Sequence, residues 1–229
     1  PFFEFFRGTP HQAAAVKELE DALPQELLAE DAAWFEAWKA SGIAQKAVVP
    51  YVHQLDFKYK GYRRCLDASA AMLALMYDKV KSVEEYGEIR KRFGDTTDIN
   101  AQVRTLREIG LNAEFRNDAD GALVEAEIAS GRPVLAGWLH KGNMLRGEPP
   151  VCSSLNCGHW SVIVGFEGTE STGDAQWVMH DPMGAPDIER GGHPNRYGGK
   201  NVRVPRRTFK QRWQVEGPGS GWIILVDDE

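Results

Sequence analysis

The sequence contains no apolar run long enough to cross a membrane. A transmembrane helix needs roughly 18 or more consecutive apolar residues, and no stretch of the 229 residues approaches that length. No signal peptide is visible, because the apolar start at Phe2 is short and is interrupted by Glu4. Internal repeats and low-complexity tracts are also absent. With 42% hydrophobic and 26% charged residues, the composition predicts a soluble globular protein with its own core.

Cysteine is scarce, with three residues in the chain. Cys152 and Cys157 lie five positions apart and can pair, which would leave Cys65 as the free thiol. Such a disulfide would indicate an oxidising compartment, reached by secretion or by delivery from a phage. A structural zinc site takes four ligands, and no second paired cluster accompanies this one. We therefore predict neither a metal nor another cofactor.

Charge is distributed unevenly around a net value of −6. The segment 1–40 holds eight acidic and three basic residues, whereas the segment 190–212 holds eight basic residues and no acidic one. The basic run is either a surface for an anionic polymer or acidic peptide, or a solvated loop that the acidic segment neutralises. Without a basic overall balance or a recognisable module, no nucleic-acid partner is predicted. The oligomeric state is left open.

The first 46 residues are predicted to form a helical arm, and residues 47–229 a single domain. Two amphipathic helices in the arm meet at Pro24, which can stop one and begin the next. The second carries an aromatic stripe that includes Trp34, Phe35 and Trp38. This stripe predicts docking, either onto the body of the same protein or onto a cell wall or another protein.

The remaining chain changes from helical to extended patterns, which predicts an α+β fold with an antiparallel sheet. Ser82 opens one helix as part of a capping box, Asp98 caps another, and a weak helix spans 121–129. Apolar and β-branched runs predict strands at 111–115, 133–139, 159–166, 176–181, 201–205 and 221–227. Between the predicted strands 176–181 and 201–205, the glycine-rich segment 181–200 predicts a long loop.

Cys65 stands at the start of a predicted helix that is apolar on nearly every side. Residues 66–77 contain neither Gly nor Pro, and only Asp67 and Ser69 are polar among the apolar positions, so the helix should be buried through the domain. Unpaired N–H groups at a helix N-terminus favour a thiolate. The preceding Arg63 and Arg64 could favour it further. The alternative is that Cys65 is simply a small apolar residue at the end of a core helix.

A nucleophilic thiol needs a base, and His159 is the candidate among six histidines. It opens a predicted strand, where a rigid backbone would fix the ring. The next strand ends at Asp181, one hairpin away, which can accept a hydrogen bond from the imidazole and set its tautomer. A metal site is the alternative, built from the ligand types at Cys157, His159, His180 and Asp181.

These motifs together resemble a known family. The segments VPYVHQLD, Cys65 with Ala68, Ser69 and Ala71, GHWSVIVGF and HDPMG are similar to papain-like cysteine peptidases of the bacteriocin-processing, double-glycine leader type, over roughly residues 48–184. The resemblance implies a papain-like fold in which Cys65 attacks, His159 is base and acid, Asp181 orients His159, and Gln54 donates to the oxyanion. The family often has an acidic residue before the cysteine and Gly after it, where this chain has Arg64 and Leu66. No membrane segment or ATP-binding cassette follows, so a stand-alone relative is expected.

The sequence thus predicts a thiol protease or amidase that hydrolyses an amide through a Cys65 thioester. Its substrate would be a peptide, including a glycine-containing one, or the peptide stems of peptidoglycan, as for a lytic enzyme of bacterial or phage origin. A transglutaminase-like acyltransferase would use the same pair of residues. An inactive papain-like binding module is the alternative from outside the enzymes.

Overall fold

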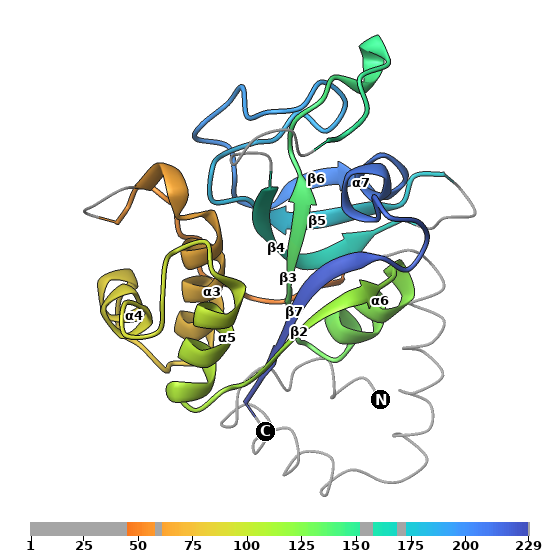
Figure 1. Ribbon diagram of the computed structural model, residues 1–229. Helices are drawn as coiled ribbons and strands as arrows, with labels where there is room; N and C mark the ends of the chain where they lie inside the picture. Colours follow the sequence, from red (N-terminus) through yellow and green to blue (C-terminus); the bar gives the residue numbers. More distant parts are fainter. Residues whose placement is uncertain (1–44, 58–60, 152–157, 169–172, 229) are drawn as a thin grey trace, which may run out of the picture.

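The computed structural model describes residues 45–57, 61–151, 158–168 and 173–228 (Figure 1). Nearly all of the predicted arm, together with Cys152 and Cys157, lies outside these residues, so the arm and the disulfide stay predictions. Gln45 and Lys46, which the sequence assigned to the end of the arm, form β1 (Gln45–Lys46) against the domain's sheet. In the described part of the chain, no helix is long and apolar enough to cross a membrane.

All strand pairs in the sheet are antiparallel, in the order β2-β7-β3-β4-β5-β6, with β1 paired to β4. The predicted strands are present, and the first is longer than expected. Their bounds are β2 (Asn112–Ala119), β3 (Val134–Leu139), β4 (Gly158–Glu167), β5 (Gln176–His180), β6 (Val202–Pro205) and β7 (Gly221–Asp227).

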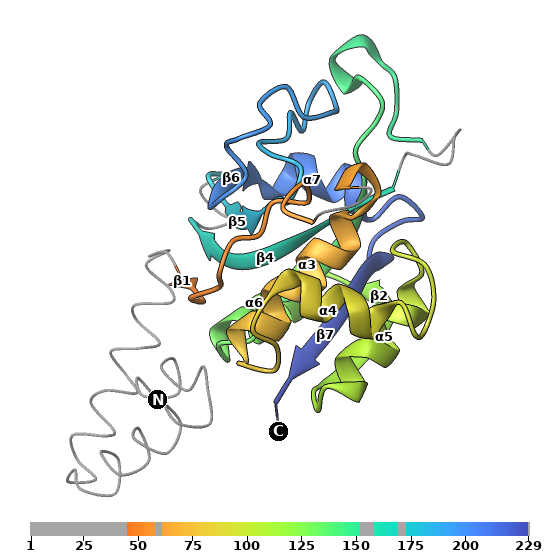
Figure 2. The same ribbon diagram turned by 90° about the vertical axis from the view of Figure 1, so that its left-hand side faces the viewer.

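Helices cover the two faces of this sheet (Figures 1 and 2). One face packs on α3 (Cys65–Met76) and α5 (Ile99–Glu108), with α4 (Val83–Arg90) against these two helices, and the other face packs on α6 (Gly121–Ala129) and α7 (Arg206–Trp213). Along β4, Trp160, Val162 and Val164 join the core under α3, whereas Ile163 joins the other core, because successive side chains of a strand point to opposite faces. The predicted α+β class, with the Cys65 helix on an antiparallel sheet, is confirmed. Two single 3₁₀ turns, Gly61–Arg63 and Met144–Arg146, complete the described elements.

The side chains predicted to cap helices do so. The Ser82 hydroxyl accepts from the Glu85 N–H at 3.2 Å, and Asp98 accepts from the first N–H groups of α5. Asp120 caps α6 in the same way, at the Leu123 N–H. These bonds satisfy donors that the helix itself leaves unpaired.

The basic run 190–212 is a solvated loop only in its first part. From Val202 onward it forms β6 and then α7, a helix that the sequence analysis did not predict. The side chain of Arg212 is fully buried, and Arg206 is buried against Trp177, with its guanidinium 4.2 Å from the ring centroid. Part of this positive charge is therefore held inside the fold.

Candidate active site

Cys65 is the first residue of α3, and the end of this helix has no side-chain cap. Arg64 occupies the N-cap position without making a capping hydrogen bond, in contrast to the capped α4, α5 and α6. The Cys65 thiol is free and partly exposed. One turn later, the Ser69 hydroxyl donates to the Trp160 carbonyl at 3.1 Å, which ties this end of α3 to β4. The first-turn N–H groups are therefore left for a negative charge beside Cys65.

The arginines before Cys65 are paired with carboxylates. Arg64 Nη1 donates to Asp67 at 2.9 Å, and the Arg63 guanidinium lies 2.6 Å from Asp95. The expectation that these arginines favour the thiolate loses support, because their charge is shared with neighbouring acids. What remains to favour a Cys65 thiolate is the helix end and the imidazole described next.

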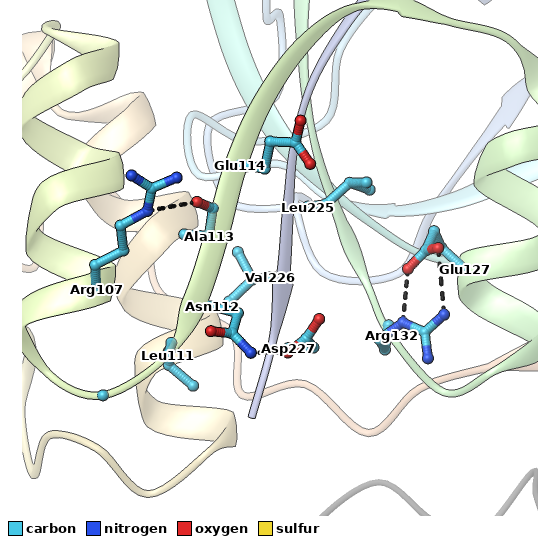
Figure 3. Close-up of a pocket in the computed structure, with 11 residues that line it drawn as sticks. Arg107, Leu111, Asn112, Ala113, Glu114, Glu127, Arg132, Leu225, Val226 and Asp227 are labelled. Atoms are coloured by element: carbon cyan, nitrogen blue, oxygen red, sulfur yellow. Dashed lines mark hydrogen bonds and ion pairs between the residues drawn. The ribbon is translucent and has the colours of Figure 1, made fainter. Parts of the chain in front are cut away.

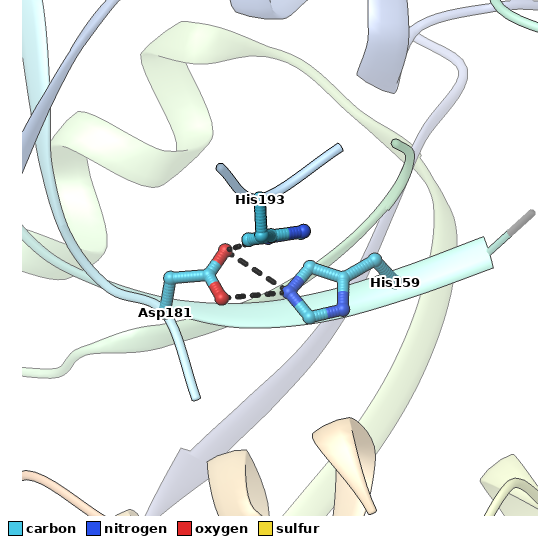
Figure 4. Close-up of side chains that lie close together, drawn as sticks. All are labelled: His159, Asp181 and His193. Carbon is cyan, nitrogen blue, oxygen red and sulfur yellow. Dashed lines mark hydrogen bonds and ion pairs between the residues drawn. The ribbon is translucent and has the colours of Figure 1, made fainter. Parts of the chain in front are cut away.

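His159 is the second residue of β4, and its ring is buried against Asp181, which follows β5. Its Nε2 lies 2.9 Å from both carboxylate oxygens, as the dashed lines in Figure 4 mark. The Trp138 indole packs on the imidazole in a T-shaped arrangement at a centroid distance of 5.2 Å. The other ring nitrogen, Nδ1, points away from Asp181 and is a buried atom without a hydrogen-bond partner among the described residues.

Asp181 is fully buried and accepts from four groups. Besides His159, these are Ser161 Oγ at 3.0 Å, the Met183 N–H at 2.9 Å and His193 Nε2 at 3.1 Å. Burial alone would raise the pKa of this carboxyl, but the charge and hydrogen bond of His159 and the hydrogen bond of His193 hold the pKa well below its usual value. Because an ionised carboxylate only accepts, both histidines carry their proton on Nε2.

The electrostatics of His159 favour an imidazolium at neutral pH, the form that pairs with a thiolate. Burial by itself would lower the pKa of this imidazole, but the charge and hydrogen bond of Asp181, followed by interaction with Cys65, raise it to about 10. Cys65 is thus within interaction range of the ring, and Nδ1 is the nitrogen that Asp181 leaves open. Three of the predicted site residues, Cys65, His159 and Asp181, therefore lie together.

Gln54 lies at the same end of the molecule. Its side chain is buried, and its backbone N–H donates to the Pro182 carbonyl at 2.8 Å, directly after Asp181. The side-chain oxygen accepts no hydrogen bond among the described residues. This placement brings the Gln54 backbone beside the segment that begins at Asp181, while the donation to an oxyanion stays a prediction.

His180 takes a structural position and is turned away from Asp181. Its Nε2 lies 3.0 Å from the Val49 carbonyl, and its Nδ1 accepts from the Asn201 N–H at 3.2 Å. Burial lowers its pKa, so the ring is neutral, with the proton on Nε2. Of the four residues in the alternative metal site, His180 is therefore bonded elsewhere through both ring nitrogens, and Cys157 lies outside the described residues.

His193, which the sequence analysis did not select, joins the site in place of His180. Among the described residues, one group has metal-ligand geometry: His159, Asp181 and His193 present donor atoms that all lie within 4.8 Å of one another. A divalent cation could bind there only by displacing the Nε2 protons of both rings from their bonds to Asp181. The hydrogen bonds now present already satisfy these groups without a cation.

Metal removal should therefore leave the site unchanged. We expect that dialysis against EDTA or 1,10-phenanthroline does not alter the rate at which iodoacetamide alkylates Cys65. Elemental analysis of protein purified without chelator should find well below one metal ion per chain. Stoichiometric zinc whose removal speeds alkylation would contradict this prediction and revive the metal alternative.

A cavity of about 870 Å³ lies elsewhere, between the ends of β2 and β7 and the adjoining α5 and α6 (Figure 3). Its lining is charged and largely self-paired: Arg107 donates to the Ala113 carbonyl, and Arg132 pairs with Glu127. No cysteine, serine or histidine lines it. The cavity thus offers carboxylates but neither a thiol nor an imidazole, and Cys65, His159 and Asp181 are not among its lining residues.

Neither a protein-family model nor a curated protein matches the sequence. Solved structures with a similar fold include a double-glycine-motif protease from an AMS/PCAT transporter, in complex with its leader peptide. It is 19% identical, the match covers 79% of this chain and 92% of that one, and the TM-score is 0.43. The peptidase domain of Streptococcus ComA, a bifunctional ABC transporter, is 18% identical over 81% and 99%, with a TM-score of 0.48. A C39-like peptidase from Bacillus anthracis is 13% identical over 78% and 94%, with a TM-score of 0.46.

Proposed function

We propose that this protein is a cysteine peptidase or amidase with Cys65 as the nucleophile, His159 as base and acid, and Asp181 as the group that orients His159. One arrangement supports the proposal: His159 Nε2 lies 2.9 Å from both oxygens of the fully buried Asp181, its Nδ1 has no hydrogen-bond partner among the described residues, and Cys65 stands at an uncapped helix end. A nucleophile, a base and an orienting carboxylate in this relation make up a catalytic triad.

The reaction proceeds in two halves. The proton of the Cys65 thiol passes to His159 Nδ1, where the raised pKa of the ring holds it at neutral pH, and the resulting thiolate attacks the carbonyl carbon of the amide. When the tetrahedral intermediate collapses, Nδ1–H protonates the departing amine and a Cys65 thioester remains. Nδ1 then takes a proton from water, the resulting hydroxide attacks the thioester, and the carboxylic acid leaves as the thiol is restored. Asp181 stays ionised throughout and stabilises the imidazolium that forms twice.

The negative oxygen of each intermediate needs donors. The Cys65 N–H is available because the N-terminus of α3 is uncapped, and the positive end of the helix adds to its effect. Gln54 is the proposed second donor, since its buried side chain lies on the segment that is bonded to Pro182. The fixed donors of an oxyanion hole favour an intermediate over the flat substrate carbonyl.

Alkylation tests the catalytic pair directly. At pH 7 we expect stoichiometric labelling by iodoacetamide at Cys65, ahead of any labelling at Cys152 or Cys157 when the products are mapped by mass spectrometry. His159→Ala should slow labelling at Cys65 by roughly tenfold or more, because the imidazolium that stabilises the thiolate is lost. Sluggish labelling of the wild type that rises only above pH 8 would instead favour the inactive binding module.

The substrate class that we propose is a peptide amide, either in a glycine-containing peptide or in a cell-wall stem peptide. Incubation with a Gly-Gly peptide library and with purified peptidoglycan should release new amines that mass spectrometry can locate. Cys65→Ala is the matched control and should release none. Release of ammonia with transfer of the acyl group to an added amine, without cleavage, would identify the acyltransferase instead.

A further inference from the structure

The Asp181 carboxylate serves two histidines, and the catalytic scheme uses only one of them. His193 Nε2 lies 3.1 Å from Asp181 Oδ2, and its ring centroid is 4.6 Å from that of His159 at an interplanar angle of 64° (Figure 4). The His193 side chain is only 3% exposed. His193 is therefore a buried polar side chain in direct contact with the carboxylate of the proposed triad.

His193 is a neutral donor. Burial lowers the pKa of its imidazole, the hydrogen bond to Asp181 opposes this, and a charged His159 nearby lowers it again. A neutral ring that bonds through Nε2–H stabilises the negative charge on Asp181 without placing a second positive charge beside the His159 imidazolium. It also occupies a direction on Oδ2 that would otherwise be open to water or to rotation of the carboxylate.

The fold secures this contact through a buried arginine. Arg212, on α7, donates to the carbonyls of Leu139 at the end of β3 and of Lys141 and Gly142 after it, and to those of Ile188 and Glu189 before His193. Because a guanidinium holds its donors in one plane and stays charged, it fixes the two loops against each other.

Two glycines then turn the chain inward toward Asp181. Gly191 and Gly192 have φ values of +79° and +83°, and the Gly192 N–H donates to the His140 carbonyl at 2.7 Å. A Cβ on Gly191 would lie 2.8 Å from the Gly142 carbonyl oxygen. Both the backbone conformation and the close approach therefore need glycine at this point of the turn.

We propose that His193 is a positioning residue for the triad: as a neutral Nε2–H donor, it holds the Asp181 carboxylate in the orientation that receives the His159 proton. This inference rests on the proposed function and deepens it. It assigns no proton transfer to His193, which touches neither the thiol nor the substrate in the scheme above.

Two variants of His193 separate the effect of its hydrogen bond to Asp181 from the effect of its ring shape. His193→Phe keeps a planar ring without a donor, and we expect the rate constant for Cys65 alkylation by iodoacetamide at pH 7 to fall roughly tenfold, as loss of a bond to a charged group predicts. His193→Gln can place an amide N–H where Nε2 now lies and should stay within about threefold of the wild type. Melting temperatures of both variants identify any loss of folding.

A double-mutant cycle tests whether the effect passes through Asp181. In an Asp181→Asn background, His193→Phe should cause no further loss of the alkylation rate. An equal loss in both backgrounds, or Gln and Phe variants that behave alike while folded, would overturn the positioning role. If the wild-type thiol itself reacts sluggishly, the proposed function fails first. A reactive wild type with an equally reactive Phe variant defeats only this inference.

Discussion

Asp181→Asn should remove nearly all peptidase activity while the protein stays folded. His159 Nε2 contacts both carboxylate oxygens, and Ser161, Met183 and His193 donate to the same group. An amide replaces one acceptor with an NH₂ donor, so the His159 tautomer with its proton on Nδ1 becomes favoured. That nitrogen can then no longer accept the thiol proton. In a serine triad the corresponding change costs about 10⁴-fold in kcat, and we expect a loss of the same order here.

The pH dependence of alkylation gives a second measure of this change. In the wild type, Asp181 raises the His159 pKa to about 10. The imidazolium therefore persists from neutral pH to about pH 9, and the labelling rate should be nearly constant over this interval. In the Asn variant the negative charge is gone while burial still lowers the His159 pKa. The ring is then neutral at pH 7, and labelling should rise with pH as for an ordinary thiol, whose pKa is about 8.5.

A matched control for the Asp181 variant is Asp118→Asn, which makes the same change in an exposed carboxylate that pairs with Arg116 on β2. It should leave both the rate and its pH profile unaltered. An Asp181→Asn protein that cleaves substrate at even a tenth of the wild-type rate, with a flat profile, would show that the carboxylate does not set the tautomer of His159.

The parts of the site that could be predicted from the sequence are those with a local signal. Cys65 precedes an apolar run free of Gly and Pro. His159 stands near the start of one predicted strand, and Asp181 at the end of the next. These positions depend on secondary structure, which the pattern of apolar residues largely determines. The placement of His159 beside Asp181 follows because the outer ends of two antiparallel hairpin strands lie close together. Their catalytic roles remain predictions that the experiments above address.

His193 and Arg212 could not be predicted because their partners are set by tertiary structure. His193 reaches Asp181 from an irregular loop, where no periodicity relates side-chain direction to sequence position. Arg212 belongs to a run of positive charge that is typical of a solvated surface, yet its side chain is fully buried. Its partners are backbone carbonyls of two remote loops. Because every residue has a backbone carbonyl, no residue type in the sequence indicates these partners. The glycine-rich segment 181–200 predicted a long loop but not the direction in which the chain turns within it.

The second large effect is expected at Asp67, the other fully buried carboxylate near Cys65. It accepts from Arg64 at 2.9 Å, from Arg90 at 2.9 and 3.2 Å, and from Gln102 at 2.7 Å. These bonds join the first turn of α3 to α4 and α5. Asp67→Asn keeps the volume but leaves two buried guanidinium groups without their anion. Breaking a buried ion pair on one side typically costs about 3 to 5 kcal/mol, and we expect unfolding free energy to fall by that amount.

Urea denaturation measures this loss, with Glu108→Gln as control because Glu108 pairs with Arg92 at the surface, where a pair contributes about 1 kcal/mol or less.

The same Asp→Asn change should therefore have different results at the two buried sites, Asp181 and Asp67. At Asp181 the main partner is a histidine, which can lose its proton and become neutral, so the fold survives and the chemistry fails. At Asp67 the partners are arginines, which cannot lose theirs, so the cost appears in stability. An Asp67→Asn protein as stable as the control would mean that water or rearranged side chains solvate Arg64 and Arg90.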